Sequence, residues 1–137
     1  MSVEHVPGEC WYEHRVSYGE TDQMGYFYYG EYLHLFERAR SKFIRDHGMS
    51  YSEVERRGLI LPVREAACRY RIPARYDEAI WVHVRVEKWG RASVRFAYEV
   101  RDAERETLKA TGYTEHACAD MDGKPVRVPE WLRQLFP

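Results

Sequence analysis

The chain has 137 residues, of which 45% are apolar and 31% are charged, and its formal net charge is -1. This length and apolar share suit one domain with a single core. A net charge near zero provides no overall field to attract nucleic acid or an anionic membrane. Residues 1–16 lack the basic and apolar regions of a secretory signal, and no stretch approaches the ~20 apolar residues of a membrane span. We therefore expect a cytoplasmic protein without nucleic-acid or membrane partners.

The cysteines argue against a covalent or metal framework. Cys10, Cys68 and Cys118 form an odd set without CxxC spacing. Such a set is typical of buried thiols in a reducing compartment rather than of disulfides or a zinc site. We therefore expect no structural metal.

A long helix is predicted between Gly30 and Gly48. Its buried stripe has helical spacing and consists of Tyr32, Leu35, Phe36, Ala39 and Phe43. Gly48 stands where the end of a helix favours a left-handed residue. A shorter helix follows, because Ser50 and Glu53 match a capping box and Gly58 ends the turn.

From Leu61 onward the apolar residues alternate, which predicts strands with one buried face. The inward positions are Ala66, Cys68, Tyr70 and Ile72, then Ile80, Val82, Val84 and Val86, then Val94, Phe96, Tyr98 and Val100. The turns at 76–78, Gly90 and 102–106 are short enough to require antiparallel hairpins. We expect further strands at 12–18 and about 108–120, and a short last strand near 126–128.

A long helix and a sheet with one apolar face bury each other by packing together. The predicted fold class is therefore α+β, with a curled antiparallel sheet wrapped round one long helix. No internal repeat or linker interrupts residues 1–137, so we expect one domain. Its chemistry must lie on loops or edges of that unit.

The segment 18–29 is the richest in unusual residues, with two glycines, two acids and four consecutive aromatic residues. Asp22 precedes the helix by several residues, so its carboxylate and the unpaired N–H groups of the first helical turn can face one volume. These groups suit acyl transfer, because a carboxylate can attack the carbonyl or activate water and fixed N–H donors can hold the developing oxyanion. The alternative is that Asp22 only caps a helix or forms an Asx turn. Some of the aromatic residues 26–29 must line a cleft or a subunit interface.

Several separated motifs together resemble one family. They are Tyr18-x-x-Thr21-Asp22-x-x-Gly25, Glu37-Arg38-Ala39-Arg40, and the segments 70–77, 87–93 and 122–129. In this order they resemble the 4-hydroxybenzoyl-CoA and YbgC-like acyl-CoA thioesterase family, whose members have the hotdog fold. The resemblance covers nearly the whole chain and implies a single hotdog thioesterase domain over residues 1–137.

The resemblance implies that Asp22 is catalytic, as nucleophile or general base on the thioester. It also implies that the backbone N–H of Tyr29 polarises the thioester carbonyl. Tyr29 departs from the YbgC-like branch, which has histidine there, and matches the 4-hydroxybenzoyl-CoA branch. Gly25 and Tyr26 belong to the same segment and are expected at the substrate. No cofactor is implied, and proteins of this kind form homodimers or homotetramers with active sites between subunits.

Coenzyme A carries phosphates, so the enzyme needs local cations. Lys88 and Arg91 flank the Trp89-Gly90 turn and are candidates, and the resemblance supports Arg91 in particular. The alternative is a solvated hairpin tip. The four consecutive aromatic residues 26–29 favour an aromatic or bulky planar acyl group.

We therefore expect an acyl-CoA thioesterase that releases a free acid and CoA. Two alternatives stay open: release of an acyl chain from an acyl carrier protein, and a non-catalytic acyl-CoA-binding module. A dehydratase is disfavoured, because the sequence pairs no histidine with a carboxylate in the catalytic loop. His34 and Glu37 have HxxE spacing but no second pair to complete a metal site, and no GxSxG or HExxH motif occurs.

Overall fold

A computed structural model describes residues 8–136. The strands are β1 (Glu9–Arg15), β2 (Val63–Tyr70), β3 (Ala79–Trp89), β4 (Ser93–Arg101) and β5 (Leu108–Ala117). The helices are α1 (Tyr32–Asp46), α2 (Tyr51–Arg56) and α3 (Glu130–Leu135), with 3₁₀ turns η1 (Tyr18–Glu20) and η2 (Tyr29–Glu31) before α1. All neighbouring strands are antiparallel, in the order β1-β3-β4-β5-β2.

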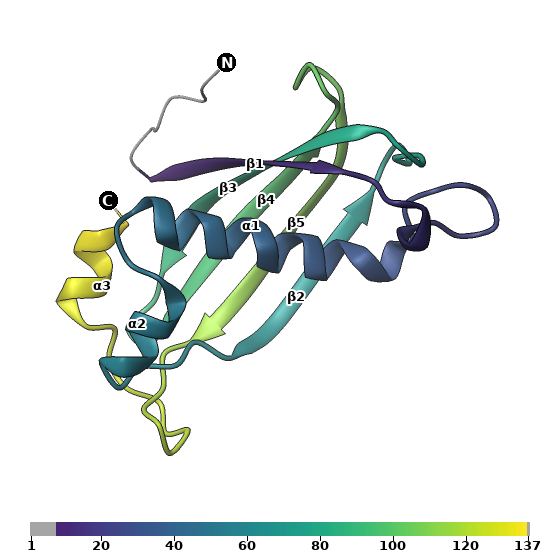
Figure 1. The fold of residues 1–137 in the computed structure, drawn as a ribbon. Coiled ribbons are helices and arrows are strands. Elements are labelled where there is room, and N and C mark those ends of the chain that lie inside the picture. Colours follow the sequence, from purple (N-terminus) through teal and green to yellow (C-terminus); the bar gives the residue numbers. More distant parts are fainter. Residues whose placement is uncertain (1–7, 137) are drawn as a thin grey trace.

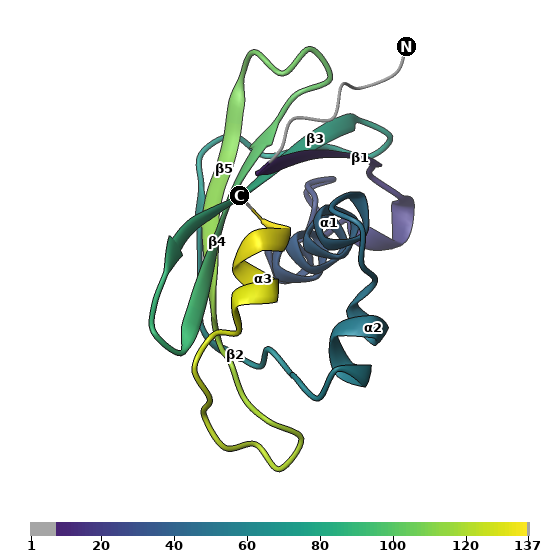
Figure 2. The same cartoon turned by 90° about the vertical axis from the view of Figure 1, so that its left-hand side faces the viewer.

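The sheet curls round α1, and all three helices lie on the same side of it (Figures 1 and 2). The predicted stripe of α1 is fully buried, and it faces the alternating apolar residues of β3 and β4. The predicted α+β class is therefore confirmed. Among residues 8–136, no helix combines the length and the apolar character that a membrane crossing requires.

The ends of the helices follow the sequence signals with one difference. Gly48 directly follows His47, the C-cap residue of α1, and has φ +100°, the left-handed conformation expected after the end of a helix. Ser50 caps α2 by accepting a hydrogen bond from the Glu53 N–H at 3.2 Å. The Glu53 carboxylate pairs with Arg56 and Arg57. The predicted capping box is thus found only in its first half among the described residues.

Two strand predictions need correction. The first strand covers Glu9–Arg15 rather than 12–18, because the chain turns into η1 at Tyr18. The buried face predicted for residues 66–72 is wrong along its whole length: Ala66 is exposed, Cys68 is half-buried, Tyr70 is 50% exposed and Ile72 is 44% exposed. The physical reason is position: β2 is an edge strand, and α1 lies mainly against β1 and β3.

The C-terminal segment also differs from the prediction. No strand forms at 126–128, where Val126 and Val128 donate single backbone bonds to Cys118 and Arg91. The chain instead ends in α3, which the sequence analysis did not predict because six residues hold too little periodicity. The buried ring of Phe136 lies 5.0 Å from Phe43 and closes that end of the core.

The Phe36 side chain of α1 reaches the sheet at Gly112 on β5. The Phe36 ring stacks on Tyr98 with centroids 4.3 Å apart and packs over Gly112. A Cβ at position 112 would lie 2.5 Å from the Phe36 ring and 2.6 Å from the carbonyl oxygen of Ala67. Glycine at this position therefore makes room for the Phe36 ring against the sheet.

Replacing Gly112 with alanine is expected to lower the free energy of unfolding by about 1–3 kcal/mol, since the new methyl group overpacks the core. Denaturant unfolding followed by circular dichroism measures the change. Gly19→Ala is the control, because nothing lies within 4 Å of a Cβ there. Equal stability of Gly112→Ala and the parent protein would contradict this account of the packing.

Candidate active site

The segment between β1 and α1 folds back on itself as a narrow hairpin. The Tyr28 N–H donates to the carbonyl oxygen of Glu20 at 2.8 Å, and the Asp22 N–H donates to that of Tyr26 at 2.9 Å. At the tip, the Gly25 N–H donates to the Asp22 carbonyl oxygen at 2.9 Å, and Gly25 has φ +79°. This left-handed conformation, which favours glycine, lets the chain reverse immediately after Asp22.

The hairpin is also fixed from outside, by the chain just before β3. The Phe27 N–H donates to the carbonyl oxygen of Ala74 at 2.7 Å, and the Tyr76 N–H donates to that of Gly25 at 3.3 Å. The Arg75 guanidinium lies 4.8 Å from the centre of the Tyr26 ring. These contacts place the tip of the hairpin against the end of the sheet where β3 begins.

The Asp22 carboxylate is held through one oxygen. Its Oδ1 accepts hydrogen bonds from the N–H groups of Met24 at 2.9 Å and Tyr26 at 3.2 Å, which is the Asx turn considered above. Among residues 8–136, no hydrogen bond reaches Oδ2. The half-buried carboxylate is thus oriented by one oxygen, and the other remains available for chemistry.

Asp22 lines two hollows. One, of about 270 Å³, is walled mainly by aromatic side chains: Tyr26, Phe27, Tyr29, Tyr32 and Tyr70. The other, of about 870 Å³, is bordered by Gly25, Tyr28 and Tyr76 among others. Four of the predicted site residues, Asp22, Gly25, Tyr26 and Tyr29, therefore line these adjoining hollows.

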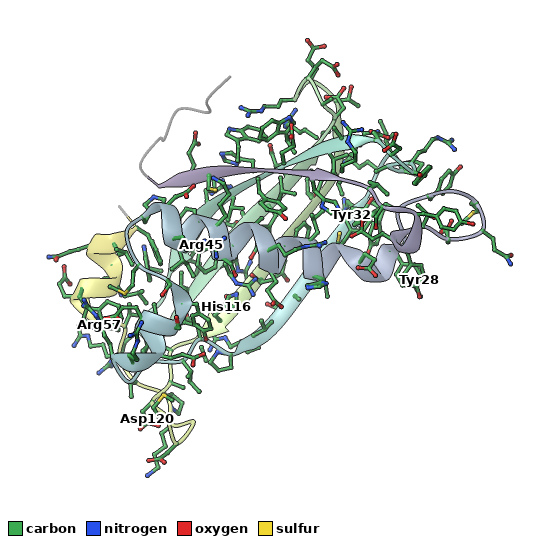
Figure 3. All side chains as sticks on the ribbon, viewed as in Figure 1. Tyr28, Tyr32, Arg45, Arg57, His116 and Asp120 are labelled. Atoms are coloured by element: carbon green, nitrogen blue, oxygen red, sulfur yellow. The ribbon has the colours of Figure 1, made fainter. Side chains whose placement is uncertain are left out.

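The aromatic wall is a packed set of rings at the N-terminal end of α1, where Figure 3 labels Tyr28 and Tyr32. The Tyr32 ring lies 4.8 Å from Phe27 and 5.0 Å from Tyr70. Burial raises the pKa of Tyr32 to about 12, so its hydroxyl stays protonated at neutral pH. Tyr32 can therefore donate a hydrogen bond but cannot act as a general base.

The backbone N–H of Tyr29, a residue that lines the same pocket, lies at the start of η2. The first hydrogen bond of η2 runs from the Glu31 N–H to the Tyr28 carbonyl oxygen at 2.9 Å, so the Tyr29 N–H precedes the helical pattern. Within the described part of the chain this N–H has no hydrogen-bond partner. The Tyr29 carbonyl oxygen accepts from the Tyr70 hydroxyl at 3.3 Å, which ties η2 to the edge strand.

The structure places Lys88 and Arg91 far from Asp22. Both are exposed at the β3–β4 turn, and the 11 residues of β3 span roughly 33 Å between that turn and the Asp22 hairpin. The Cys118 N–H donates to the carbonyl oxygen of Ala92 in this turn. The turn therefore lies at the end of the molecule where Figure 3 labels Asp120. One chain therefore does not bring these cations to its own Asp22.

Behind the hairpin lies a half-buried ionic cluster that was not predicted from the sequence. His14 Nε2 lies 2.8 Å from Glu20 Oε1, and an Arg38 nitrogen lies 3.3 Å from Glu20 Oε2. The expectation that no histidine pairs with a carboxylate in this loop was wrong. None of the three residues lines either hollow that contains Asp22. Strand periodicity places His14 on a face but gives no signal of a partner beyond the following turn.

Another histidine lies at a separate cavity of about 250 Å³ between α1, α2 and β5. His116 is 1% exposed, its Nδ1 lies 2.9 Å from the Leu61 carbonyl oxygen, and its Nε2 lies 2.8 Å from the Thr114 hydroxyl. Burial, with the nearby Arg40 charge, lowers the pKa of His116 to about 4. With both nitrogens engaged, this ring is a structural group. Among residues 8–136, no cluster of three or more His, Cys, Asp or Glu side chains could hold a metal ion.

An α+β hotdog fold with a carboxylate beside a helix N-terminus defines the class of the protein, and comparison with known families gives the same assignment. Residues 16–136 match the model of the thioesterase-like superfamily. The chain belongs to this family.

Particular relatives cover almost the whole chain. The acyl-CoA thioesterase YbgC of Haemophilus influenzae is 31% identical over 125 residues, which are 89% of this chain and 90% of the relative. A DHNA-CoA thioesterase structure from Staphylococcus aureus superposes with a TM-score of 0.83 at 35% identity, over 91% of this chain and 87% of the other. A 4-hydroxybenzoyl-CoA thioesterase shares the fold, with a TM-score of 0.86 at 18% identity, covering 95% of this chain and 99% of that one.

Proposed function

We propose that this chain hydrolyses acyl-CoA thioesters to a free acid and CoA, with Asp22 as the catalytic carboxylate. One observation carries the proposal: Asp22 and Tyr29 line the same pocket, and within residues 8–136 neither Asp22 Oδ2 nor the Tyr29 N–H has a hydrogen-bond partner, whereas Asp22 Oδ1 is fixed. The similarity to YbgC, named as an acyl-CoA thioesterase, supports the substrate class. The proposed unit of function is one hotdog domain comprising residues 1–137.

The proposed chemistry begins at the thioester carbonyl carbon. Asp22 Oδ2 either attacks this carbon or takes a proton from a water molecule that attacks it. The Tyr29 N–H stabilises the negative charge that develops on the carbonyl oxygen. The C–S bond then breaks, and the sulfur leaves as a thiolate. A thiol has a pKa of about 8.5, so its departure needs no strong acid. In the nucleophilic route, water then hydrolyses the acyl-aspartate anhydride and restores Asp22.

The proposed assembly is a homodimer, or a pair of dimers, in which one subunit supplies Asp22 and its partner supplies phosphate contacts. The separation of Lys88 and Arg91 from Asp22 along β3 supports this arrangement. The exposed edge strand β2 supports it as well, because its unpaired backbone groups can bind another strand. Tyr70 at the end of β2 already borders the aromatic pocket.

Asp22→Asn is expected to lower kcat by at least ~10²-fold, because an amide can act neither as a base nor as an anionic nucleophile. The asparagine Oδ1 can still accept from Met24 and Tyr26, so the hairpin and the affinity for CoA should persist. Thiol release from a panel of short, long and aromatic acyl-CoAs gives kcat, and calorimetry gives the affinity. Full activity in this variant would refute the proposed mechanism.

Arg91→Ala is expected to raise KM for acyl-CoA several-fold with little change in kcat, as happens when uniform binding is lost. Acyl-pantetheine lacks the 3′-phosphate and the pyrophosphate, so its KM should not change. An acyl carrier protein substrate, assayed in parallel, tests release from a carrier. An equal rise in KM for acyl-CoA and acyl-pantetheine would mean that Arg91 supports the β3–β4 hairpin rather than binding the ligand.

The shared site can be tested with hybrids. Mixing Asp22→Asn chains with Arg91→Ala chains should restore activity at low acyl-CoA concentration, because one of the two sites in a hybrid dimer is then intact. Sedimentation at micromolar protein should show no monomer. A monomer with full turnover would contradict the shared site.

A further inference from the structure

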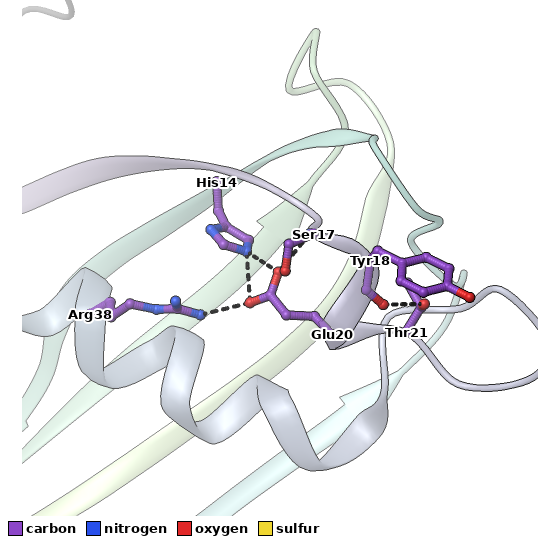
Figure 4. Close-up of polar contacts among 6 residues, drawn as sticks. All are labelled: His14, Ser17, Tyr18, Glu20, Thr21 and Arg38. Carbon is purple, nitrogen blue, oxygen red and sulfur yellow. Dashed lines mark hydrogen bonds and ion pairs between the residues drawn. The ribbon is translucent and has the colours of Figure 1, made fainter.

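Glu20 lies at the base of the Asp22 hairpin and joins three elements (Figure 4). Its Oε1 lies 2.8 Å from His14 Nε2 on β1 and accepts from the Ser17 N–H at 2.8 Å, at the start of η1. Its Oε2 accepts from Arg38 on α1 at 3.3 Å. One carboxylate thus connects the strand before the hairpin, the turn that opens it and the helix that follows it.

These contacts are partly shielded from solvent. The side chains of Glu20 and His14 are each 13% exposed. Burial by itself would raise the pKa of Glu20, but the hydrogen bonds from Ser17 and His14 outweigh it and lower the pKa to about 2. The guanidinium of Arg38 donates to Glu20 through Nη2. Its Nε is buried and has no hydrogen-bond partner among the described residues. Glu20 is therefore ionised throughout the neutral range.

The main chain of Glu20 connects this anchor to the proposed reacting groups. Its carbonyl oxygen accepts from the Tyr28 N–H, which is the base rung of the hairpin. Asp22 follows two residues later on one arm, and Tyr29 directly follows Tyr28 on the other. The position of Glu20 relative to β1 and α1 therefore sets where the Asp22 carboxylate and the Tyr29 N–H lie relative to each other.

We infer that Glu20 is a positioning residue for thioester hydrolysis, which acts by holding the Asp22 hairpin against β1 and α1. The inference rests on the proposed function. Glu20 lines neither hollow, so we assign it no direct contact with the substrate. Its effect comes through geometry, since a misplacement of about 1 Å at a reacting group can reduce the rate by ~10²-fold.

Glu20→Gln tests the inference. The amide keeps the shape of the side chain but cannot receive charge-assisted bonds from both His14 and Arg38. We expect kcat to fall by about tenfold or more, with KM for acyl-CoA changed less than about twofold, because the aromatic pocket itself is intact. The matched control is Glu115→Gln: its parent carboxylate is 14% exposed and also pairs with two cations, Arg64 and Arg95. This control should keep its kcat.

A second measurement separates positioning from general structural support. If Glu20 acts through Asp22, Glu20→Gln should change the residual rate of the Asp22→Asn variant by less than about twofold, measured with enzyme in excess. If Glu20 has a purely structural role, Glu20→Gln should lower the rate of the parent protein and that of the Asp22→Asn variant by the same factor. Arg38→Gln removes the helix contact alone and should show the same non-additivity, which keeps the test decisive if Glu20→Gln folds poorly.

The outcomes separate the two proposals. Full activity of Asp22→Asn overturns the proposed function. An impaired Asp22→Asn variant together with an unchanged kcat in Glu20→Gln overturns only the role of Glu20. That role is also overturned if Glu20→Gln lowers the rate by the same factor in the parent protein and in the Asp22→Asn variant.

Discussion

The position of α1 on the sheet is fixed by the contact of Phe36 with Gly112 and Tyr98, and the rest of the structure depends on it. The stacked rings and the missing Cβ leave one close-packed arrangement for the Phe36 side chain against Tyr98 of β4 and Gly112 of β5. A rigid helix transmits that position along its length. Its N-terminal end, with η2 and the Tyr29 N–H, is thereby placed at one end of the sheet. The proposed oxyanion donor thus takes its place from core packing.

The same helix fixes the Asp22 hairpin through a different face. Arg38 lies two residues after Phe36, so it points away from the sheet contact and reaches Glu20. Apolar packing on one face and an ionic contact on the other then determine where the carboxylate and the amide stand. Electrostatic preorganisation of this kind requires groups that do not move when charge develops. A half-buried, ionised Glu20 suits that requirement better than a solvated pair, whose side chains remain mobile.

The parts of the fold that the sequence predicted are those where periodicity and burial agree. The stripe of α1 and the alternation in β3 and β4 each run over many residues between two packed layers. Prediction failed where burial depends on neighbours that periodicity cannot reveal. Residues 66–72 alternate like a half-buried strand, yet β2 is an edge strand and most of its residues are exposed. The six residues of α3 are too few for a helical pattern, and the His14–Glu20 contact crosses a turn.

At Asp22 the two competing interpretations prove compatible. The sequence left open a structural Asx turn or a reactive carboxylate, and the hydrogen bonds from Met24 and Tyr26 show that the turn exists. Both bonds go to Oδ1, so the turn fixes the rotamer of the carboxylate without consuming Oδ2. The interaction that would make Asp22 merely structural therefore prepares it for the proposed reaction, since an oriented anion needs little reorganisation before it attacks or accepts a proton.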